Sequence, residues 1–214
     1  MMIVRMKTPA SDTPSSTFQD NLVPGTEWGA LKPTTKFGQM PVLRLANGKE
    51  LAQSQPMVRY LARTSTTPLG KSLYPIDDAY AAFQIDEYMV AVEDARNKLM
   101  PTFAIADQAE KEAARTALFQ EGGAVFDGLK KLEGSLGNDA FMVGNKLSLA
   151  DLGLFVTVNQ CRAGFLDGIP VSGWLEKMPK LEKIVNAVAA VPEIKAYYTE
   201  KAAANKLYTP HASG

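Results

Sequence analysis

Short apolar runs separated by turn-forming residues dominate the first third of the chain. Residues 2–6 and 42–45 form two such runs, and Asn47-Gly48 follows the second. Apolar runs bounded by turn residues predict strands, and Asn-Gly predicts a hairpin with a type I′ turn, in which both central residues have positive φ. Gln53-Ser54 then precede residues 55–62, which predict a helix with Ser54 at the N-cap.

The remainder of the chain changes to a helical pattern. Apolar residues recur at intervals of three and four, as expected for helices that share a core. Proline stands at the first position of two of these segments, and Pro101 ends another. The predicted helices cover residues 79–100, 107–136 with a kink at Gly122-Gly123, 149–163, 179–190 and 192–203.

Ser148 and Asp151 have the spacing of a capping box, in which each side chain satisfies a backbone donor of the other residue. Leu147 and Leu152 occupy the two staple positions around it. We interpret this motif as a folding element rather than a reactive site. Cys161, in the helix that follows, is expected to be an inert core residue rather than a nucleophile.

The helix start at Gln53-Ser54 is the first candidate for binding chemistry. Pro56 suits the first turn, where a missing N–H would have been unpaired in any case. A helix N-terminus with a hydroxyl and free N–H groups attracts a carboxylate, and Gln53 adds an amide that can donate and accept. From this local pattern alone, a Ser that only caps the helix remains the alternative.

Composition narrows the function classes. The 214 residues include 23 basic and 23 acidic side chains, so no charge excess favours nucleic acid or an anionic membrane surface. The single cysteine excludes an intramolecular disulfide and a C-x-x-C motif, which fits the cytoplasm or another reducing intracellular compartment. The single histidine, His211, argues against multi-histidine metal sites and Ser-His-Asp catalysis. No apolar run is long enough for a membrane span or a signal peptide.

Several independently spaced motifs between residues 28 and 62 together resemble the amino-terminal domain of cytosolic glutathione transferases, nearest to the sigma class. Trp28 and Lys32 match W-x3-K, residues 37–43 match F-G-Q-x-P-V-L, and residues 53–62 match Q-S-x-x-I-x-R-Y-L-A. The resemblance implies a truncated thioredoxin-like α/β domain followed by an all-helical bundle. It extends from about residue 18 to about residue 198.

The resemblance also implies a glutathione site. Gln53 and Ser54 would hold the γ-glutamyl carboxylate, and the backbone at a cis Met40-Pro41 bond would pair with the cysteinyl unit. Trp28, Lys32 and Gln39 would contact the glycyl end. In the helical half, Asp94 would reach across a homodimer to the glutathione amine, although a solvated helix face is the alternative for an acidic residue there.

The chain departs from the family pattern ahead of Phe18, which aligns with the start of the second strand. Family members place a first strand, a loop with the catalytic Tyr or Ser and a full helix before that point. Here residues 8–17 contain two prolines and a series of hydroxyl residues, which predict a loop, and the first tyrosine is Tyr60. The catalytic residue is therefore not identified. Ser11, Ser15, Ser16 and Thr17 are candidate hydroxyls, each with a solvated linker as the alternative.

Three functions remain open at this stage. The first is a transferase that conjugates or isomerises a small hydrophobic electrophile with glutathione, a detoxification chemistry. The second is a glutathione-binding protein without that activity. The third is a structural subunit, with a protein partner at the reduced amino-terminal domain. Phe83, Tyr88, Met100 and Phe103 could line a hydrophobic pocket, but apolar residues at helical spacing are usually core, so they are not assigned to the site.

The predicted organisation has two domains. Residues 1–64 form the thioredoxin-like glutathione-binding domain, and residues 65–75 form a polar, turn-rich linker. Residues 76–203 form the all-helical domain, and residues 204–214 form an irregular tail.

Overall fold

A computed structural model describes residues 2–6, 18–164 and 166–204 of the chain. The structure divides into two compact units, Met1–Tyr74 and Pro75–Gly214. The predicted loop at residues 8–17 and most of the predicted tail lie outside the described residues. The two units are described separately below.

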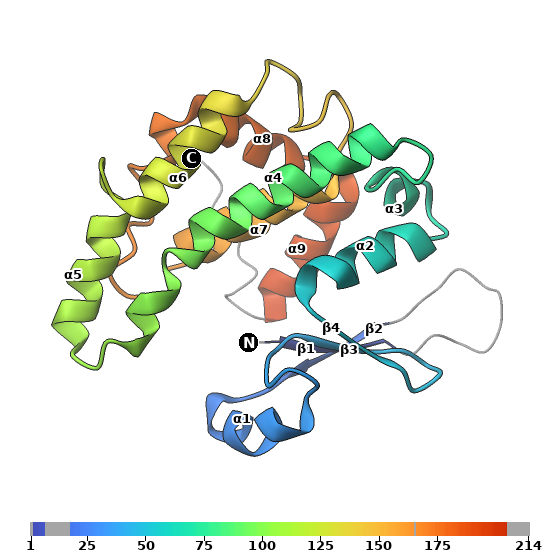
Figure 1. Cartoon of the computed structure of the whole chain (residues 1–214), viewed down its shortest axis with the longest axis horizontal. Helices are drawn as coiled ribbons and strands as arrows, with labels where there is room; N and C mark the ends of the chain where they lie inside the picture. The colour runs from blue at the N-terminus through green and yellow to red at the C-terminus, as the bar shows by residue number, and fades with distance from the viewer. Residues whose placement is uncertain (1, 7–17, 165, 205–214) are drawn as a thin grey trace. The chain divides into compact units, whose positions relative to one another are not determined.

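The first unit is built on a four-stranded sheet with the order β2-β1-β3-β4 (Figure 1). Its strands are β1 (Met2–Met6), β2 (Phe18–Leu22), β3 (Val42–Arg44) and β4 (Glu50–Ala52). Strand β1 runs parallel to β3, with Val4 opposite Leu43, and antiparallel to β2. Both strands expected before the hairpin are therefore present.

The antiparallel pairing of β1 and β2 follows from the length of their connection. Strand β1 ends at Met6 and β2 begins at Phe18, so residues 7–17 join them. A parallel pair needs a crossover of a dozen or more residues, usually through a helix, whereas antiparallel strands accept a shorter connection. Strands β1 and β2 thus lie side by side in antiparallel orientation, and the α/β class expected for this unit is confirmed.

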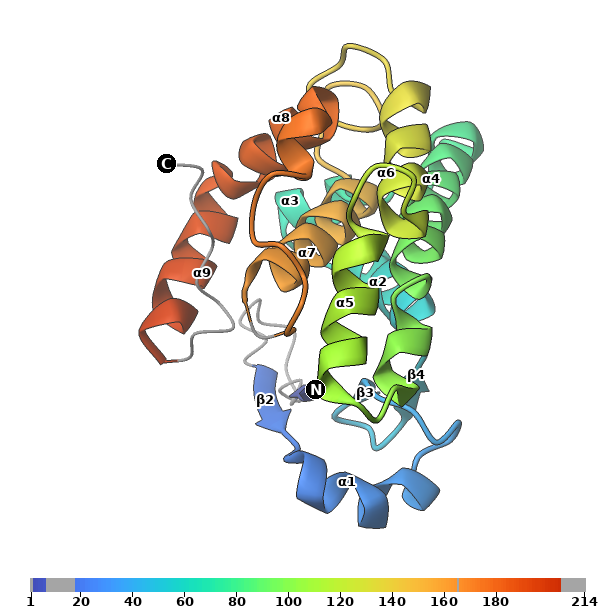
Figure 2. The same cartoon turned by 90° about the vertical axis from the view of Figure 1, so that its left-hand side faces the viewer.

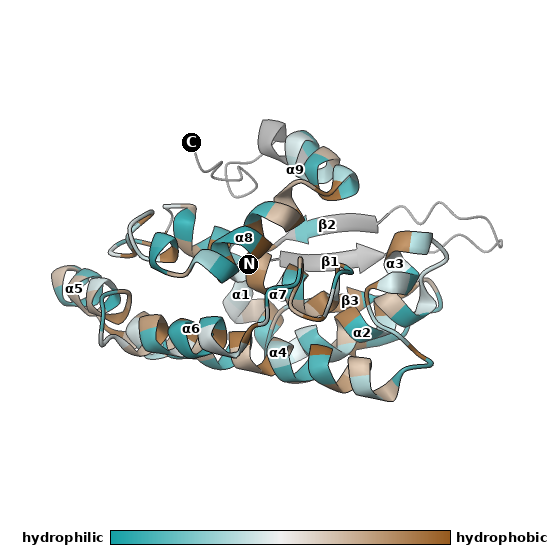
Figure 3. Ribbon diagram, turned by 90° about the horizontal axis from the view of Figure 1, so that it is seen from above, coloured by the Kyte–Doolittle hydropathy of each residue, from teal (hydrophilic) through white to brown (hydrophobic). Residues whose placement is uncertain are grey.

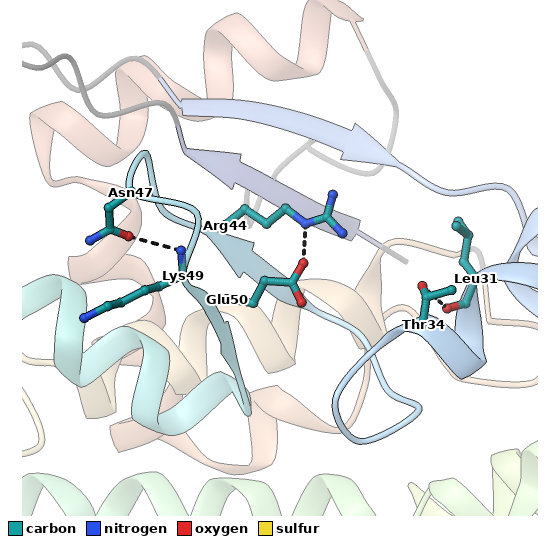
Figure 4. A network of polar contacts seen from close by, with 6 residues as sticks. All are labelled: Leu31, Thr34, Arg44, Asn47, Lys49 and Glu50. Atoms are coloured by element: carbon teal, nitrogen blue, oxygen red, sulfur yellow. Dashed lines mark hydrogen bonds and ion pairs between the residues drawn. The ribbon is translucent and has the colours of Figure 1, made fainter.

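The predicted hairpin between β3 and β4 is confirmed, but its turn type is different (Figure 4). Gly48 has φ of 82°, whereas Asn47 does not share the positive φ that a type I′ turn requires. The N–H of Gly48 donates to Leu45 O at 3.0 Å and the N–H of Leu45 donates to Lys49 O at 2.9 Å. These bonds define a three-residue loop with a bulge at Gly48. Asn47 stabilises it by accepting the Lys49 N–H with its side chain.

The helices of the first unit are α1 (Gly25–Leu31), η1 (Lys32–Thr34), α2 (Ser54–Thr64) and α3 (Pro68–Ser72). Helices α1 and α2 lie on opposite sides of the sheet (Figures 1 and 2). Helix α2 buries Met57 and Ala62. Helix α3 falls within the segment 65–75 that was predicted to be a linker, and the side chain of Thr67 caps it.

The second unit is all helical. Its elements are α4 (Ala79–Asn97), η2 (Met100–Ala104), α5 (Gln108–Leu118), α6 (Ala124–Ser135), α7 (Leu149–Arg162), η3 (Leu175–Lys177), α8 (Pro179–Ala189) and α9 (Pro192–Ala204). Helix α4 packs along α6 and α7, and α7 packs on α8 (Figure 2). Apolar and polar residues alternate around these helices, as Figure 3 shows for α4 and α6. The all-helical architecture is confirmed.

The single helix predicted over residues 107–136 is wrong, because two helices occupy this range. Helix α5 ends at Leu118, and the chain turns through Gly122, which has φ of 84°. A Cβ at Gly123 would lie only 2.2 Å from the backbone oxygen of Ala117. The glycine pair therefore belongs to a turn that separates two helices rather than to a kink within one helix.

Helix α7 is the buried centre of this unit, and the predicted capping box at its start is present. One carboxylate oxygen of Asp151 accepts the backbone N–H of Ser148 at 2.8 Å and its hydroxyl at 2.7 Å. The other oxygen accepts the N–H of Met142 at 2.8 Å. Asp151 is fully buried, so these bonds replace its lost hydration and fix the preceding loop against the helix.

None of the helices in the described part of the chain combines the length and the apolar character needed to cross a bilayer.

Candidate functional site

The start of α2 carries the strongest candidate binding site. Gln53, rather than Ser54, is its N-cap, so the expectation for Ser54 is corrected by one position: Ser54 is the first helical residue. The first intrahelical bond runs from Met57 N to Gln53 O at 3.1 Å. The N–H groups of Ser54 and Gln55 therefore have no acceptor within the helix, and Pro56 has no N–H to offer.

The backbone of Gln53 is in an unusual conformation, with φ of 71° and ψ of 114°. Among the described residues other than glycine, it is the only one with positive φ. Such a conformation costs on the order of 1–3 kcal/mol and is typical of functional sites. Its side chain does not cap α2 and is exposed. The Gln53 amide is thus directed away from the helix that it precedes.

That amide meets the loop before β3. Nε2 of Gln53 donates to Oε1 of Gln39 at 3.4 Å, which brings together two residues that are fourteen positions apart in the sequence. The next peptide bond, Met40-Pro41, is cis, as the resemblance implies. Val42 and Leu43 directly after it are buried in β3, so the core of the unit holds this loop in place.

Lys32 lies on the other side of the same loop. Its backbone N–H donates to Trp28 O at the end of α1, which links the two residues of the W-x3-K motif. Its side chain passes Gly38, because a Cβ placed there would lie 3.6 Å from Cε of Lys32. Gly38 has φ of 62°, a conformation that glycine adopts without steric cost. Trp28 is half-buried and Lys32 is exposed.

These groups together suit an extended ligand with carboxylates. The first turn of α2 supplies two N–H donors, a hydroxyl and the positive end of the helix dipole for one anionic group. Lys32 supplies a full positive charge for a second one. Gln39 and Gln53 add amides, and the cis bond lies directly before β3, outside the paired part of that strand. The arrangement provides binding groups but no evident acid, base or nucleophile among these residues.

The other predicted residues belong to the second unit or lie outside the described residues. Asp94 belongs to α4 of the second unit, where its side chain is exposed and its neighbour Glu93 pairs with Arg96 at 2.9 Å. Ser11, Ser15, Ser16 and Thr17 lie outside the described residues. The roles of all the predicted site residues therefore remain predictions.

Cys161 is buried in α7, as expected, and burial raises the pKa of its thiol to about 12. Arg96 lowers the pKa by a smaller amount. A thiol with so little thiolate at neutral pH is a poor nucleophile. Any thiolate chemistry at neutral pH therefore has to use a thiol that a ligand supplies.

Sequence reasoning missed one feature of the site, the backbone of Gln53. Glutamine has no special preference for positive φ, so residue type gave no signal for it. The N–H of Gln55 was also not singled out, because its availability depends on which residue is the N-cap.

Comparison with known proteins places the chain in a family. The sequence model described as "Glutathione S-transferase, C-terminal domain" matches residues 93–201. Glutathione S-transferase 4 of Caenorhabditis elegans is 30% identical, and the match covers 84% of this chain and 82% of that protein. Glutathione S-transferase 1 of Ascaris suum is also 30% identical, with 86% and 84% covered.

Solved structures agree on the fold. Prostaglandin synthase D of Nilaparvata lugens superposes with a TM-score of 0.70 at 22% identity, over 93% of this chain and 98% of that one. The two relatives and the family model together cover both units, and this structure has the same architecture. The chain therefore belongs to the glutathione S-transferase family.

Proposed function

We propose that this protein binds glutathione at the start of α2 and uses it to conjugate or isomerise a small hydrophobic electrophile. The observation that carries the proposal is the junction of Gln39, the cis Met40-Pro41 bond and Gln53-Ser54. A family scaffold that had lost its ligand would not require a strained backbone and two converging amides at this point.

Each part of glutathione has a counterpart in the site. The γ-glutamyl carboxylate is placed at the Ser54 hydroxyl and the N–H groups of Ser54 and Gln55, with the Gln53 amide beside it. The cysteinyl unit pairs with the backbone at Met40-Pro41, and the glycyl carboxylate lies toward Lys32 and Trp28. Gln39 connects the part of the site for the γ-glutamyl end with the part for the glycyl end, because it already accepts a hydrogen bond from Gln53.

The chemical step requires a glutathione thiolate. A free thiol with a pKa near 8.5 is only a few per cent ionised at pH 7, so a donor to the thiolate has to lower that pKa. Ser11, Ser15, Ser16 and Thr17 are the hydroxyls that we propose for this role. The thiolate then attacks the electrophilic carbon of the second substrate, and the leaving group departs with the bonding electrons.

An apolar second substrate is supported by exposed side chains in the helical unit. Met100 and Phe103 project from η2, with 42% and 50% of their surfaces exposed. Apolar groups that stay in water on a short helical segment are available to contact an apolar ligand.

We also propose a homodimer, and α4 supplies the support. Tyr80, Phe83 and Val90 are 70%, 59% and 47% exposed, and their spacing places them on one face of the helix. Asp94 lies on the same face, one turn beyond Val90. A partner that covers this face would therefore meet Asp94, as its proposed role toward the glutathione amine requires.

The single, buried cysteine is compatible with a reducing intracellular compartment, where we place the protein.

Calorimetric titration with reduced glutathione tests the proposal. We expect saturable binding to the natural chain and a loss of about ten- to a hundredfold in affinity for Ser54→Ala, because a hydrogen bond to a charged group is removed. Ser172→Ala, an exposed serine in the helical unit, is the matched control and should bind normally. Absence of binding to the natural chain would overturn the proposal. Binding without turnover of an activated aryl halide would retain the site and reject the transferase reaction.

A further inference from the structure

A pocket in the helical unit lies between the end of α6 and the start of α8. Its volume is about 240 Å³. A cavity of this size has room for a small organic molecule. All of its lining residues belong to residues 136–141 and 179–184, so the pocket is complete within one unit and shares no residue with the glutathione site.

The inner wall of the pocket is apolar. Leu136 and Ile184 contribute buried side chains, and Phe141 contributes a half-buried ring. A wall of this kind favours an aliphatic or aromatic body, at about 25 cal/mol for each Å² of apolar surface removed from water. The wall therefore favours a ligand with an apolar part that can pack against it.

Two ammonium groups stand at the same pocket. Nζ of Lys180 donates to the backbone oxygen of Leu136. Nζ of Lys183 donates to the backbone oxygens of Asn138 at 3.2 Å and Asp139 at 3.0 Å. These bonds tie both lysines to the loop that forms the other side of the pocket. These hydrogen bonds therefore restrict the positions of the two ammonium groups.

Both ammonium groups retain donors. An ammonium has three N–H groups, so Lys180 keeps two and Lys183 keeps one after the bonds just described. Within the described residues, neither lysine is paired with a carboxylate. Two ammonium groups with donors to spare form a receptor for an anionic oxygen group.

A side chain from α6 fixes the start of α8. The buried carboxylate of Glu133 on α6 accepts the N–H of Lys180 at 3.0 Å and the N–H of Leu181 at 2.9 Å. Both oxygens of Glu133 are thus engaged with backbone, which anchors α8 against α6. This contact keeps the two lysines at a constant position relative to the apolar wall.

We infer that this pocket binds a small organic monocarboxylate with an apolar chain or ring. Its carboxylate meets Lys180 and Lys183, and its apolar body lies against Leu136, Phe141 and Ile184. This inference goes beyond the proposed function, because the ligand is neither glutathione nor the electrophile and the site lies elsewhere.

Asp139 gives the pocket a further selectivity. Asp139 also lines the pocket and lies beside Lys183, whose ammonium donates to its backbone oxygen at 3.0 Å. Its carboxylate reduces the charge of the lining to +1 (two lysines and one aspartate), which one carboxylate neutralises and a second would exceed. We therefore expect a monocarboxylate to bind in preference to a dicarboxylate of the same length.

Nuclear magnetic resonance titration of the full ¹⁵N-labelled chain tests the inference, with hexanoate as the probe and hexanamide as its neutral match. We expect hexanoate to shift the amides of Gly137, Asp139 and Ile184 saturably, and hexanamide to bind at least about tenfold more weakly, because the hydrogen bonds to charged donors require the carboxylate. Equal binding of the two probes, or shifts that do not saturate, would overturn the inference.

Lys183→Gln provides the second arm, with Lys131→Gln as a matched exposed lysine on α6 outside the pocket. Hexanoate affinity should fall about three- to tenfold in the first variant, a range that allows for the exposure of Lys183, and should not change in the second. An equal loss in both variants would indicate general charge attraction and reject the site. Should Lys183→Gln not fold, the comparison of hexanoate with hexanamide still decides.

The same sample separates this site from the glutathione site. Saturating glutathione should leave the hexanoate affinity unchanged, and Ser54→Ala should do the same. Hexanoate shifts confined to residues 53–55 and abolished by glutathione would reject the α6–α8 site while the proposed function stands. Absence of glutathione binding to the natural chain, with an intact hexanoate response, would reject the proposed function while the α6–α8 site stands.

Discussion

The side chains of Gln53 and Gln39 meet across 3.4 Å, although the first residue precedes a helix and the second precedes a strand. Both side chains are exposed, so their hydrogen bond contributes little to stability. Its significance lies in position, because it joins the first turn of α2, the proposed anion site, to the loop with the cis Met40-Pro41 bond. A ligand that spans the two would find its donors and acceptors already aligned.

The strained backbone of Gln53 leads to the first prediction. Gln53→Gly and Gln53→Ala both remove the amide and should both weaken glutathione binding. Gln53→Gly should nevertheless be more stable than Gln53→Ala by about 1 kcal/mol, because glycine adopts φ of 71° without a Cβ clash. Urea unfolding measures the difference. Equal stability of the two variants would show that the backbone at this position is not strained.

The capping box leads to a prediction about pH. Burial raises the pKa of Asp151, while bonds from Met142 and Ser148 lower it by less. A raised pKa in the folded state means that the folded protein binds the proton more tightly than the unfolded chain. The stabilisation is therefore present below the ordinary carboxyl pKa of about 3.9 and is lost as pH rises through the higher folded value.

Asp151→Asn removes this titration. We expect the natural chain to have a higher free energy of unfolding than the variant. This difference should be largest at acid pH and should become smaller toward neutral pH. At neutral pH the variant should still be less stable by about 1–3 kcal/mol, because the amide cannot accept at both positions. Denaturant unfolding of both proteins across this pH range measures the difference. A difference that grows with pH would contradict the burial argument.

Cys161 should be chemically silent in the folded protein. With a pKa of about 12, only about one thiol in ten thousand is ionised at pH 8. We expect a disulfide reagent to label Cys161 slowly in the native protein and fully in denaturant. Cys161→Ala should leave glutathione turnover unchanged. Rapid native labelling would instead reveal opening of α7 toward solvent.

The exposed face of α4 predicts the oligomeric state. Phe83→Glu places a charge at the centre of this face, where Tyr80 stacks on Phe83 with ring centroids 6.4 Å apart. We expect sedimentation equilibrium to show a dimer for the natural chain and a monomer for this variant, because burial of an unpaired charge is costly. Val171→Glu, on an exposed valine outside α4, should stay dimeric. A natural chain that is monomeric at every concentration would reject this interface.

Much of the fold could be predicted from the sequence because its signals are local. The capping box of α7 involves residues three positions apart, and Pro179 starts α8 as its first helical residue. The hairpin at Asn47-Gly48 and the order of the binding motifs also follow from short-range patterns. The amino-acid sequence by itself determined the hairpin, the start of α8 and most of the helices of the second unit, and which residue types are candidates for the site.

The tertiary structure decided what depends on contacts between distant residues. Gln53 rather than Ser54 became the N-cap of α2, because its backbone is held outside the helical region. The break before α6 depends on how closely Gly123 approaches the backbone of Ala117. Met178, the N-cap of α8, has no polar side chain, and Glu133 from α6 accepts the free N–H groups instead. Local patterns cannot specify such pairings, because they exist only after the chain has brought the partners together.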